Sequence, residues 1–348
     1  MRRWLPLLFL SPFAAPVATT DEDFAVIGYL PEWRFESANY DVICRHVSHL
    51  ILFSIEVGAP GGAALARTDR LPATVLREAR AAATKHGTKL LLCVGGNGRS
   101  AGFSRMARKA KLRKGFLKSL RSFLDLHHFD GVDYNWEYPG AVAGGGYAPE
   151  DEVRRDYDGY AALLRESRET LGDDAVITAA YYPDGRQERF LRDSASFVDF
   201  FQSMAYDQRG RHSTMDFAEK AIRQAKPFFH HKHALGLPFY GRHVATGDWT
   251  TYEDLLLKSS SSLGEEEEDL VDDVFFNDVG TIQRKVRLAI EARIGGVMIW
   301  EVGQDCRLEA VRTHVRTCPT PEASLLVAIT DAILTTSQQQ LRGPEELR

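Results

Sequence analysis

From residue 25 to residue 300 the chain alternates between two patterns of hydrophobic and polar positions. Short runs rich in β-branched and aromatic residues are separated by longer segments in which apolar residues recur at helical spacing. The short runs predict eight strands, at Ala25–Leu30, His49–Ile55, Lys89–Val94, Gly131–Asn135, Ala175–Tyr181, Phe200–Ala205, His233–Leu237 and Gly296–Trp300. The longer segments predict amphipathic helices, among them Pro72–His86, Leu112–His127, Asp156–Leu171 and Asp278–Ile294. Gly87 and Gly172 follow two of these helices at the usual place of a C-cap.

Eight alternating strands and helices predict an α/β fold in which a parallel sheet closes into a (β/α)8 TIM barrel, as a single domain over residues 21–318. An open nucleotide-binding sheet fits less well, because no G-x-G-x-x-G follows the first strand. Gly95 and Gly96 belong to a glycine cluster that lacks the Lys-Ser or Lys-Thr of a phosphate loop. We interpret them as structural residues of a tight turn at a strand end.

The first twenty residues are typical of a signal peptide. Arg2 and Arg3 precede an apolar run at Trp4–Leu10, and small residues at Ala14–Thr20 lead to a cleavage site. The run is too short to span a bilayer, so we expect a secreted protein with no membrane partner. The alternative is a disordered start on an intracellular protein.

The last residues, 319–348, predict a helix at Ala323–Leu334 and a disordered tail. Four cysteines are present without C-x-x-C spacing, and Cys306 and Cys318 could form a bridge in an oxidising compartment. Cys93 lies in an apolar run and is expected to be a buried small residue.

Composition narrows the choice of partners. The chain has 348 residues, 44% of them hydrophobic and 26% charged, which is ordinary for a soluble protein. A net charge of −5 without a clustered basic face gives no reason to expect nucleic acid, whereas an uncharged polysaccharide is compatible. His230, His231 and His233 enter a strand at positions that do not converge on one ion, so we expect no metal.

Candidate chemistry is concentrated in residues 129–140. Side chains alternate along a strand, so Asp133, Asn135 and Glu137 point the same way, into the interior of a barrel. Three polar groups on one interior face are costly unless they serve each other or a ligand. Glu137 comes last, at the carboxyl end where barrel enzymes place their active sites, and is the expected general acid.

Six stretches, in order, resemble motifs of family 18 glycoside hydrolases, the chitinase family. Asp130 to Glu137 resembles the D-x-x-D-x-D-x-E signature. The other five are Gly28–Trp33, Leu92–Gly96 with Cys93 where Ser is usual, Met204–Asp207, Gly236–Arg242 and Gly296–Glu301. The resemblance covers about residues 21 to 305.

The resemblance implies a retaining hydrolase of chitin or related N-acetylglucosamine oligosaccharides, in which the substrate's own acetamido oxygen attacks the anomeric carbon while Glu137 protonates the leaving oxygen. It implies that Tyr206 bonds the acetamido group, Asp207 holds that sugar, and Asp133 is the inner carboxylate of a relay. Trp300 would be the apolar floor under the reacting sugar, and Asp130 would be structural. Further candidates for contact with substrate are Tyr240, Trp33, Tyr138 and Arg242.

One departure matters. The family usually has Asp where this chain has Asn135. An amide can accept a hydrogen bond from the acetamido N–H, but it lacks the charge that would raise the pKa of the neighbouring acid. We therefore expect an enzyme with a reduced rate or an altered pH optimum. The alternatives are a chitin-binding, lectin-like barrel with little turnover and a β-N-acetylglucosaminidase that acts on other glycans.

Many members of the family insert a compact α+β module between the seventh and eighth strands. Here only about Arg242 to Asn277 is available, with a serine run at Ser259–Ser262 and an acidic run at Glu265–Asp269. We predict no full module, an irregular segment whose acidic run is a solvated loop, and a shallow cleft. The chemistry implied needs no cofactor, and the sequence does not indicate an oligomeric state.

Overall fold

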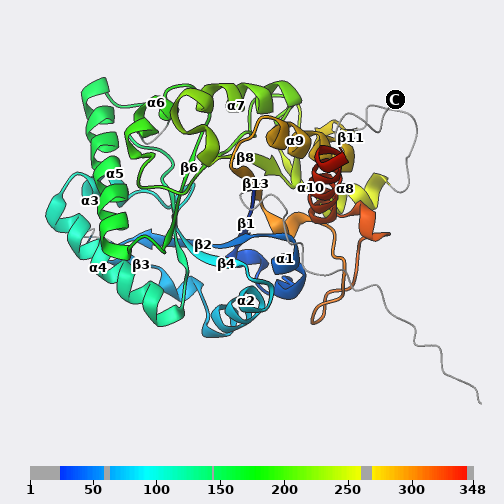
Figure 1. The fold of residues 1–348 in the computed structure, drawn as a ribbon, viewed down its shortest axis with the longest axis horizontal. Helices are drawn as coiled ribbons and strands as arrows, with labels where there is room; N and C mark the ends of the chain where they lie inside the picture. Colours follow the sequence, from blue (N-terminus) through cyan, green and yellow to red (C-terminus); the bar gives the residue numbers. More distant parts are fainter. Residues whose placement is uncertain (1–23, 59–62, 143–144, 260–268, 343–348) are drawn as a thin grey trace, which may run out of the picture.

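The computed structural model describes residues 24–58, 63–142, 145–259 and 269–342. Eight parallel strands form a closed barrel, because β1 pairs with β13 on one side and with β2 on the other (Figure 1). The barrel strands are β1 (Ala25–Pro31), β2 (His49–Val57), β4 (Lys89–Gly95), β5 (Gly131–Asn135), β6 (Val176–Tyr181), β7 (Phe200–Ser203), β8 (His233–Pro238) and β13 (Gly296–Trp300). A short strand, β3 (Leu65–Ala66), pairs antiparallel with the end of β2. The predicted TIM barrel is confirmed, with differences only at strand ends.

Helices surround the barrel (Figure 1). They are α1 (Tyr40–His46), α2 (Ala73–His86), α3 (Phe103–Ala107), α4 (Ala110–His127), α5 (Glu150–Leu171), α6 (Gln187–Leu191), α7 (Met215–Phe229), α9 (Val279–Glu291) and α10 (Leu325–Arg342). Gly87 and Gly172 end α2 and α5 with positive φ, as the sequence predicts. Helix α5 begins six residues before its predicted start, because its first turn carries acidic residues that favour a helix N-terminus but show no apolar periodicity.

The core has two layers, separated by the alternation of side chains along each strand. On β1, Ile27 and Tyr29 lie in the hydrophobic cluster inside the barrel, whereas Val26 and Leu30 pack in the layer beneath the helices. Cys93 of β4 is fully buried in the inner cluster, as predicted. The polar residues of the candidate site therefore rest on an apolar barrel interior.

The segment between β8 and β13 is more regular than the sequence indicates. It contains strands β9 (Tyr240–His243), β10 (Trp249–Thr251), β11 (Leu270–Val271) and β12 (Val274–Phe275), which form an antiparallel sheet in the order β10-β9-β12-β11, and helix α8 (Tyr252–Ser259). The prediction of an irregular segment is thus wrong for its described part, because strands of two to four residues are too short to show an alternating pattern. Most of the serine and acidic runs lies outside the described residues.

The C-terminal helix is held by a buried carboxylate and a disulfide. The predicted helix at Ala323–Leu334 forms as α10 and continues to Arg342. Buried Asp305 accepts hydrogen bonds from the backbone N–H groups of Leu325 and Leu326, both at 3.0 Å. Burial raises the pKa of Asp305 to about 6, although these bonds and one from the Ser324 hydroxyl oppose the shift.

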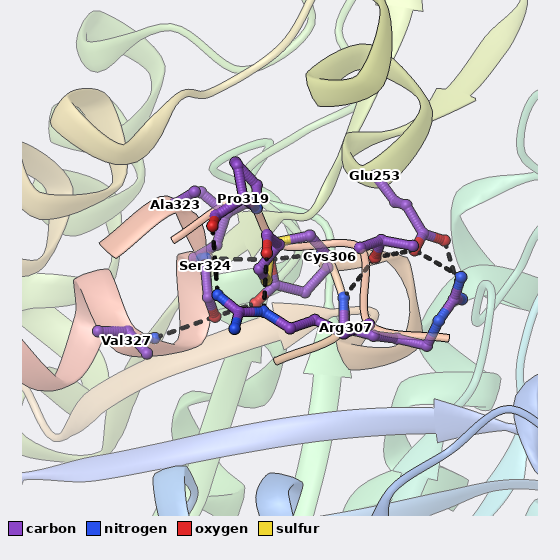
Figure 2. The surroundings of a disulfide bond; sticks show 12 residues. Glu253, Cys306, Arg307, Pro319, Ala323, Ser324 and Val327 are labelled. Carbon is purple, nitrogen blue, oxygen red and sulfur yellow. Dashed lines mark hydrogen bonds and ion pairs between the residues drawn. A yellow bond between two sulfur atoms is a disulfide. The ribbon is translucent and has the colours of Figure 1, made fainter. Parts of the chain in front are cut away.

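Beside this cap, Cys306 and Cys318 form a disulfide, as the sequence allows. Figure 2 shows Arg307, next to Cys306, pointing to Glu253 of α8, and the closest atoms of this ion pair are 2.9 Å apart. The C-terminal segment is therefore attached both to the loop after β13 and to α8. We refer to β9 to β12 together with α8, residues 240–275, as the insertion. The predicted disordered tail begins within α10, and residues 343–348 lie outside the described residues.

Candidate active site

Strand β5 brings the three polar residues of the signature to the carboxyl end of the barrel. Asp133 is fully buried and Asn135 is 3% exposed, whereas Glu137, two residues past the end of the strand, is partly exposed. Access to solvent therefore increases along the row toward Glu137. This is the face on which βα-barrel enzymes carry their active sites.

Asp133 is surrounded by donors from four other barrel strands. Its carboxylate accepts hydrogen bonds from the hydroxyls of Tyr29 at 2.9 Å and Thr178 at 2.7 Å, and from the Gln202 amide at 3.3 Å. Burial raises its pKa to about 6, and hydrogen bonds from Thr178, Cys93 and Tyr29 limit the shift. Sequence reasoning did not find Thr178 or Gln202. The signal for Thr178 is cross-strand register, since it pairs with Asp133, and this cannot be read from one strand alone.

Glu137 has the titration expected of a general acid near neutral pH. Burial raises its pKa to about 7, and the nearby charge of Asp207 acts in the same direction. Hydrogen bonds from the Asn135 side chain and the Asn97 backbone act in the opposite direction. The pKa of Glu137 is therefore raised without a carboxylate at position 135, because desolvation is the largest cause of the shift.

Asn135 presents an unused acceptor to this site. Its side-chain Oδ1 is buried and has no hydrogen-bond partner within the described residues. A buried amide oxygen without a partner is costly, so the site is prepared to receive a donor there.

Gly95 and Gly96 allow the chain to pass close to this strand end. Both have positive φ, 104° and 110°. A Cβ on Gly95 would lie 2.4 Å from the backbone oxygen of Asn135, and one on Gly96 would lie 2.3 Å from the ring of Phe53. Larger residues would therefore displace either β5 or an aromatic side chain at the mouth of the barrel.

Asp207 follows β7 with a left-handed backbone, φ 63°. Its Oδ1 accepts hydrogen bonds from the Tyr240 hydroxyl at 2.7 Å and from Arg242 Nε at 2.8 Å, and His212 Nδ1 lies 3.7 Å away. Burial favours a raised pKa, but hydrogen bonds from His212, Arg242 and Tyr240 outweigh it and lower the pKa to about 2. Asp207 is thus an anion at any working pH.

Two residues expected to contact substrate also contact Asp207. Tyr240 is only 2% exposed, so it supports Asp207 and does not offer an open face to a ligand. Arg242 also bonds Asp207, with about a third of its side chain exposed. His212, buried beneath them, was not found from the sequence because it lies in a loop five residues after Asp207 with no periodic pattern.

Aromatic side chains line the mouth of the barrel. Trp300 packs on Tyr29 and Phe53, with ring centroids 5.5 and 4.9 Å apart. Trp33 is 53% exposed and lies 5.9 Å from Phe53. The remaining candidates are Tyr206, which is buried with its hydroxyl 3.7 Å from the sulfur of Met298, and Tyr138, which is partly buried beside Tyr182.

Asp130 lies apart from this site. Its carboxylate accepts hydrogen bonds from Arg80 of α2 at 2.6 Å and from the backbone N–H of Leu90 at 2.7 Å. These contacts tie helix α2 to the start of β4. In the described part of the chain no group of three or more His, Cys, Asp or Glu could hold a metal ion.

The order and spacing of these residues agree with a known family. The model of the family described as glycosyl hydrolases family 18 matches residues 25–305. The chain belongs to this family. Among curated relatives of family 18, probable chitinase 2 of Drosophila melanogaster is 25% identical, with 64% of this chain and 58% of that protein covered. The chain therefore spans less than two thirds of the length of this relative.

Solved structures show the same fold. The family 18 chitinase ChiB of Flavobacterium johnsoniae has a TM-score of 0.70 and 22% identity, with 90% of this chain and 95% of that chain covered. Catalytic domain 2 of the Ostrinia furnacalis Group II chitinase, as an E2180L mutant in complex with penta-N-acetylchitooctaose, has a TM-score of 0.74 and 19% identity, with 90% and 97% covered. At these identities the comparison establishes the barrel.

Proposed function

We propose that this chain hydrolyses β-1,4-linked N-acetylglucosamine polymers, chitin or chitooligosaccharides, with retention of configuration and with Glu137 as general acid. The observation that carries the proposal is a glutamate at the carboxyl end of β5 whose pKa is raised to about 7 by burial. At neutral pH such a group holds its proton in a large fraction of molecules, as protonation of a leaving oxygen requires. A family 18 neighbour in complex with penta-N-acetylchitooctaose supports this class of substrate.

In the proposed first step, Glu137 gives its proton to the glycosidic oxygen as the bond to the anomeric carbon breaks. The carbonyl oxygen of the substrate's own acetamido group forms the new bond to that carbon, producing a cyclic oxazolinium ion and a free hydroxyl on the leaving sugar. The Tyr206 hydroxyl would donate to the acetamido oxygen. The unpaired Oδ1 of Asn135 would accept from the acetamido N–H, which disperses the positive charge.

In the second step the Glu137 carboxylate accepts a proton from water, and the resulting hydroxyl group opens the oxazolinium ion at the anomeric carbon. Two displacements at one carbon give net retention. Asp207, ionised and held by Tyr240 and Arg242, would hydrogen-bond the reacting sugar. Trp300 would form the apolar floor beneath it.

We also propose that the protein is secreted, with residues 1–20 as a signal peptide. The disulfide between Cys306 and Cys318 supports this, because such bonds persist in oxidising compartments. No helix in the described ranges has the length and apolar character needed to cross a membrane. Detection of the protein in culture medium with an N-terminus near Asp21 would test the assignment.

Product analysis on N-acetylglucosamine oligomers between pH 3 and 9 tests the reaction. The parent should release short oligomers, Glu137→Gln should release none while keeping its fold, and Glu291→Gln, which removes an exposed carboxylate at the end of α9, should match the parent. Failure to cleave or bind at any pH would overturn the proposal.

A lectin-like function is the second candidate, and Asn135 is the observation that favours it. In that case oligomers should bind tightly to the parent but remain intact at every pH. Asn135→Asp should then create turnover, because it restores the carboxylate that the family usually has at this position.

A further inference from the structure

Trp249 stands out on the insertion because nearly half of it is exposed, 46%. Tryptophan has a large apolar surface that proteins usually cover, and its indole is enriched where a ligand supplies the cover. Among the described residues, only Trp33 is a more exposed tryptophan, at 53%, and it lies at the mouth of the barrel. Whether Trp249 can contact a ligand bound at this site therefore depends on where it lies relative to the mouth of the barrel.

Strand register places Trp249 on the side of the insertion that faces Asp207. In the antiparallel pair of β9 and β10, Trp249 is opposite Arg242 and Thr251 is opposite Tyr240. Directly opposed residues share a face of the sheet, and so do residues two apart. Trp249 thus shares a face with Tyr240 and Arg242, the two residues that hydrogen-bond Asp207.

Ring contacts lead outward from the site along this face. The ring of Tyr206 lies 6.1 Å from that of Tyr240, and the Tyr240 ring lies 6.3 Å from that of Trp249 at an interplanar angle of 34°. Only the last ring of the series is substantially open to solvent. Trp249 is therefore two ring contacts beyond Tyr206 and forms the exposed end of the series.

We propose that Trp249 binds an outer sugar of the oligosaccharide by stacking its indole on the apolar face of an uncharged pyranose ring. The inference rests on the proposed function, because Tyr206 and Asp207 mark the place of the reacting sugar. The partly exposed guanidinium of Arg242, across the strand pair from Trp249, can donate to sugar hydroxyls. The insertion then acts as a specificity element that distinguishes long oligomers, which reach Trp249, from short ones, which do not.

The test measures binding in the Glu137→Gln background, where substrate is not consumed, by calorimetric titration with N-acetylglucosamine dimer and hexamer. Trp249→Ala should weaken hexamer binding about tenfold, which corresponds to about 1.4 kcal/mol, and should change dimer binding much less. Trp249→Phe should retain most of the affinity, since it keeps an aromatic face. The matched control is Leu257→Ala on α8, which removes another exposed apolar side chain of the same insertion, 54% exposed, and should bind like the parent.

Each outcome of these titrations either supports or overturns the proposed role of Trp249. If Trp249→Ala leaves hexamer binding unchanged, with the fold intact by thermal unfolding, the role of Trp249 is overturned and the proposed hydrolase still stands. An equal loss for dimer and hexamer would also overturn it, because Trp249 would then act on the sugars at the centre of the site. If neither oligomer binds to the Glu137→Gln protein or to the parent, the proposed function fails and the inference fails with it.

Discussion

The raised pKa of Glu137 has a consequence for stability that can be measured without any substrate. Burial raises this pKa from an ordinary value of 4.5 to about 7. Below pH 4.5 both the folded and the unfolded chain hold the proton. Between pH 4.5 and 7 the unfolded chain releases it while the folded chain does not, so rising pH favours unfolding. The neutral amide in Glu137→Gln removes this dependence.

The size of the effect follows from the shift. One pKa unit corresponds to about 1.36 kcal/mol. The titration of Glu137 therefore lowers the free energy of unfolding of the protein by about 3 kcal/mol between acid pH and pH 8. Glu137→Gln should therefore match the parent near pH 4.5, apart from a constant difference in packing, and exceed it by up to that amount at pH 8. For a chain of this size the gain corresponds to about 4 °C in Tm.

Thermal unfolding at pH 4.5, 6, 7 and 8 measures the difference between variant and parent, so that the contributions of other titrating groups cancel. Those groups include Asp133 and Lys285, both of which have pKa values shifted by burial. Glu291→Gln controls for the loss of one negative charge and should give a difference that does not vary with pH. The reasoning is refuted if the Glu137→Gln difference is also constant, or if it falls as the pH rises.

Three further changes probe other parts of the molecule. Asn135→Asp adds a negative charge beside Glu137 and should raise its pKa further, so the alkaline limb of kcat/KM should move above pH 7; an unchanged rate and profile would contradict the role given to Asn135. Gly96→Ala should lower the free energy of unfolding by roughly 3 kcal/mol, because the new Cβ meets Phe53, whereas Gly98→Ala, with positive φ but open space around it, should cost only about 1 kcal/mol in urea unfolding. Asp305→Ala should cost roughly 2 to 3 kcal/mol by the same assay, since it leaves the first N–H groups of α10 without an acceptor, and a change below 0.5 kcal/mol would show that water replaces the cap.

Much of the fold is predictable because most of the barrel strands are apolar runs of ordinary length. The segments that escaped prediction have a different physical character. The short strands β9 to β12 owe their form to pairing with one another, and the first turn of α5 owes its form to charge at a helix end. Neither effect produces a periodic pattern of apolar residues.

The same distinction holds for the candidate site. Asp133 and Asn135 lie on β5 and Glu137 follows two residues after its end, so the alternation of side chains along one stretch of chain predicts that they lie together. Thr178 meets the site through the pairing of β6 with β5, and His212 meets it through the fold of the loop after β7, so neither contact can be read from the strand that carries the signature. The sequence indicates a general acid at Glu137 but not the cause of its raised pKa, because burial of that side chain depends on residues from several parts of the chain.

Closure of the barrel also sets the order in which the protein can be completed. Strand β1 pairs with β13, so Ala25 can meet Gly296 only after synthesis has passed residue 296. Pairings of this kind slow folding and leave strand edges exposed in the meantime. The disulfide partner Cys318 and helix α10 come later still along the chain. A nascent chain should therefore remain dependent on chaperones until its C-terminal segment emerges, and shortening it from the C-terminal end should impair production of the protein more than its length alone would imply.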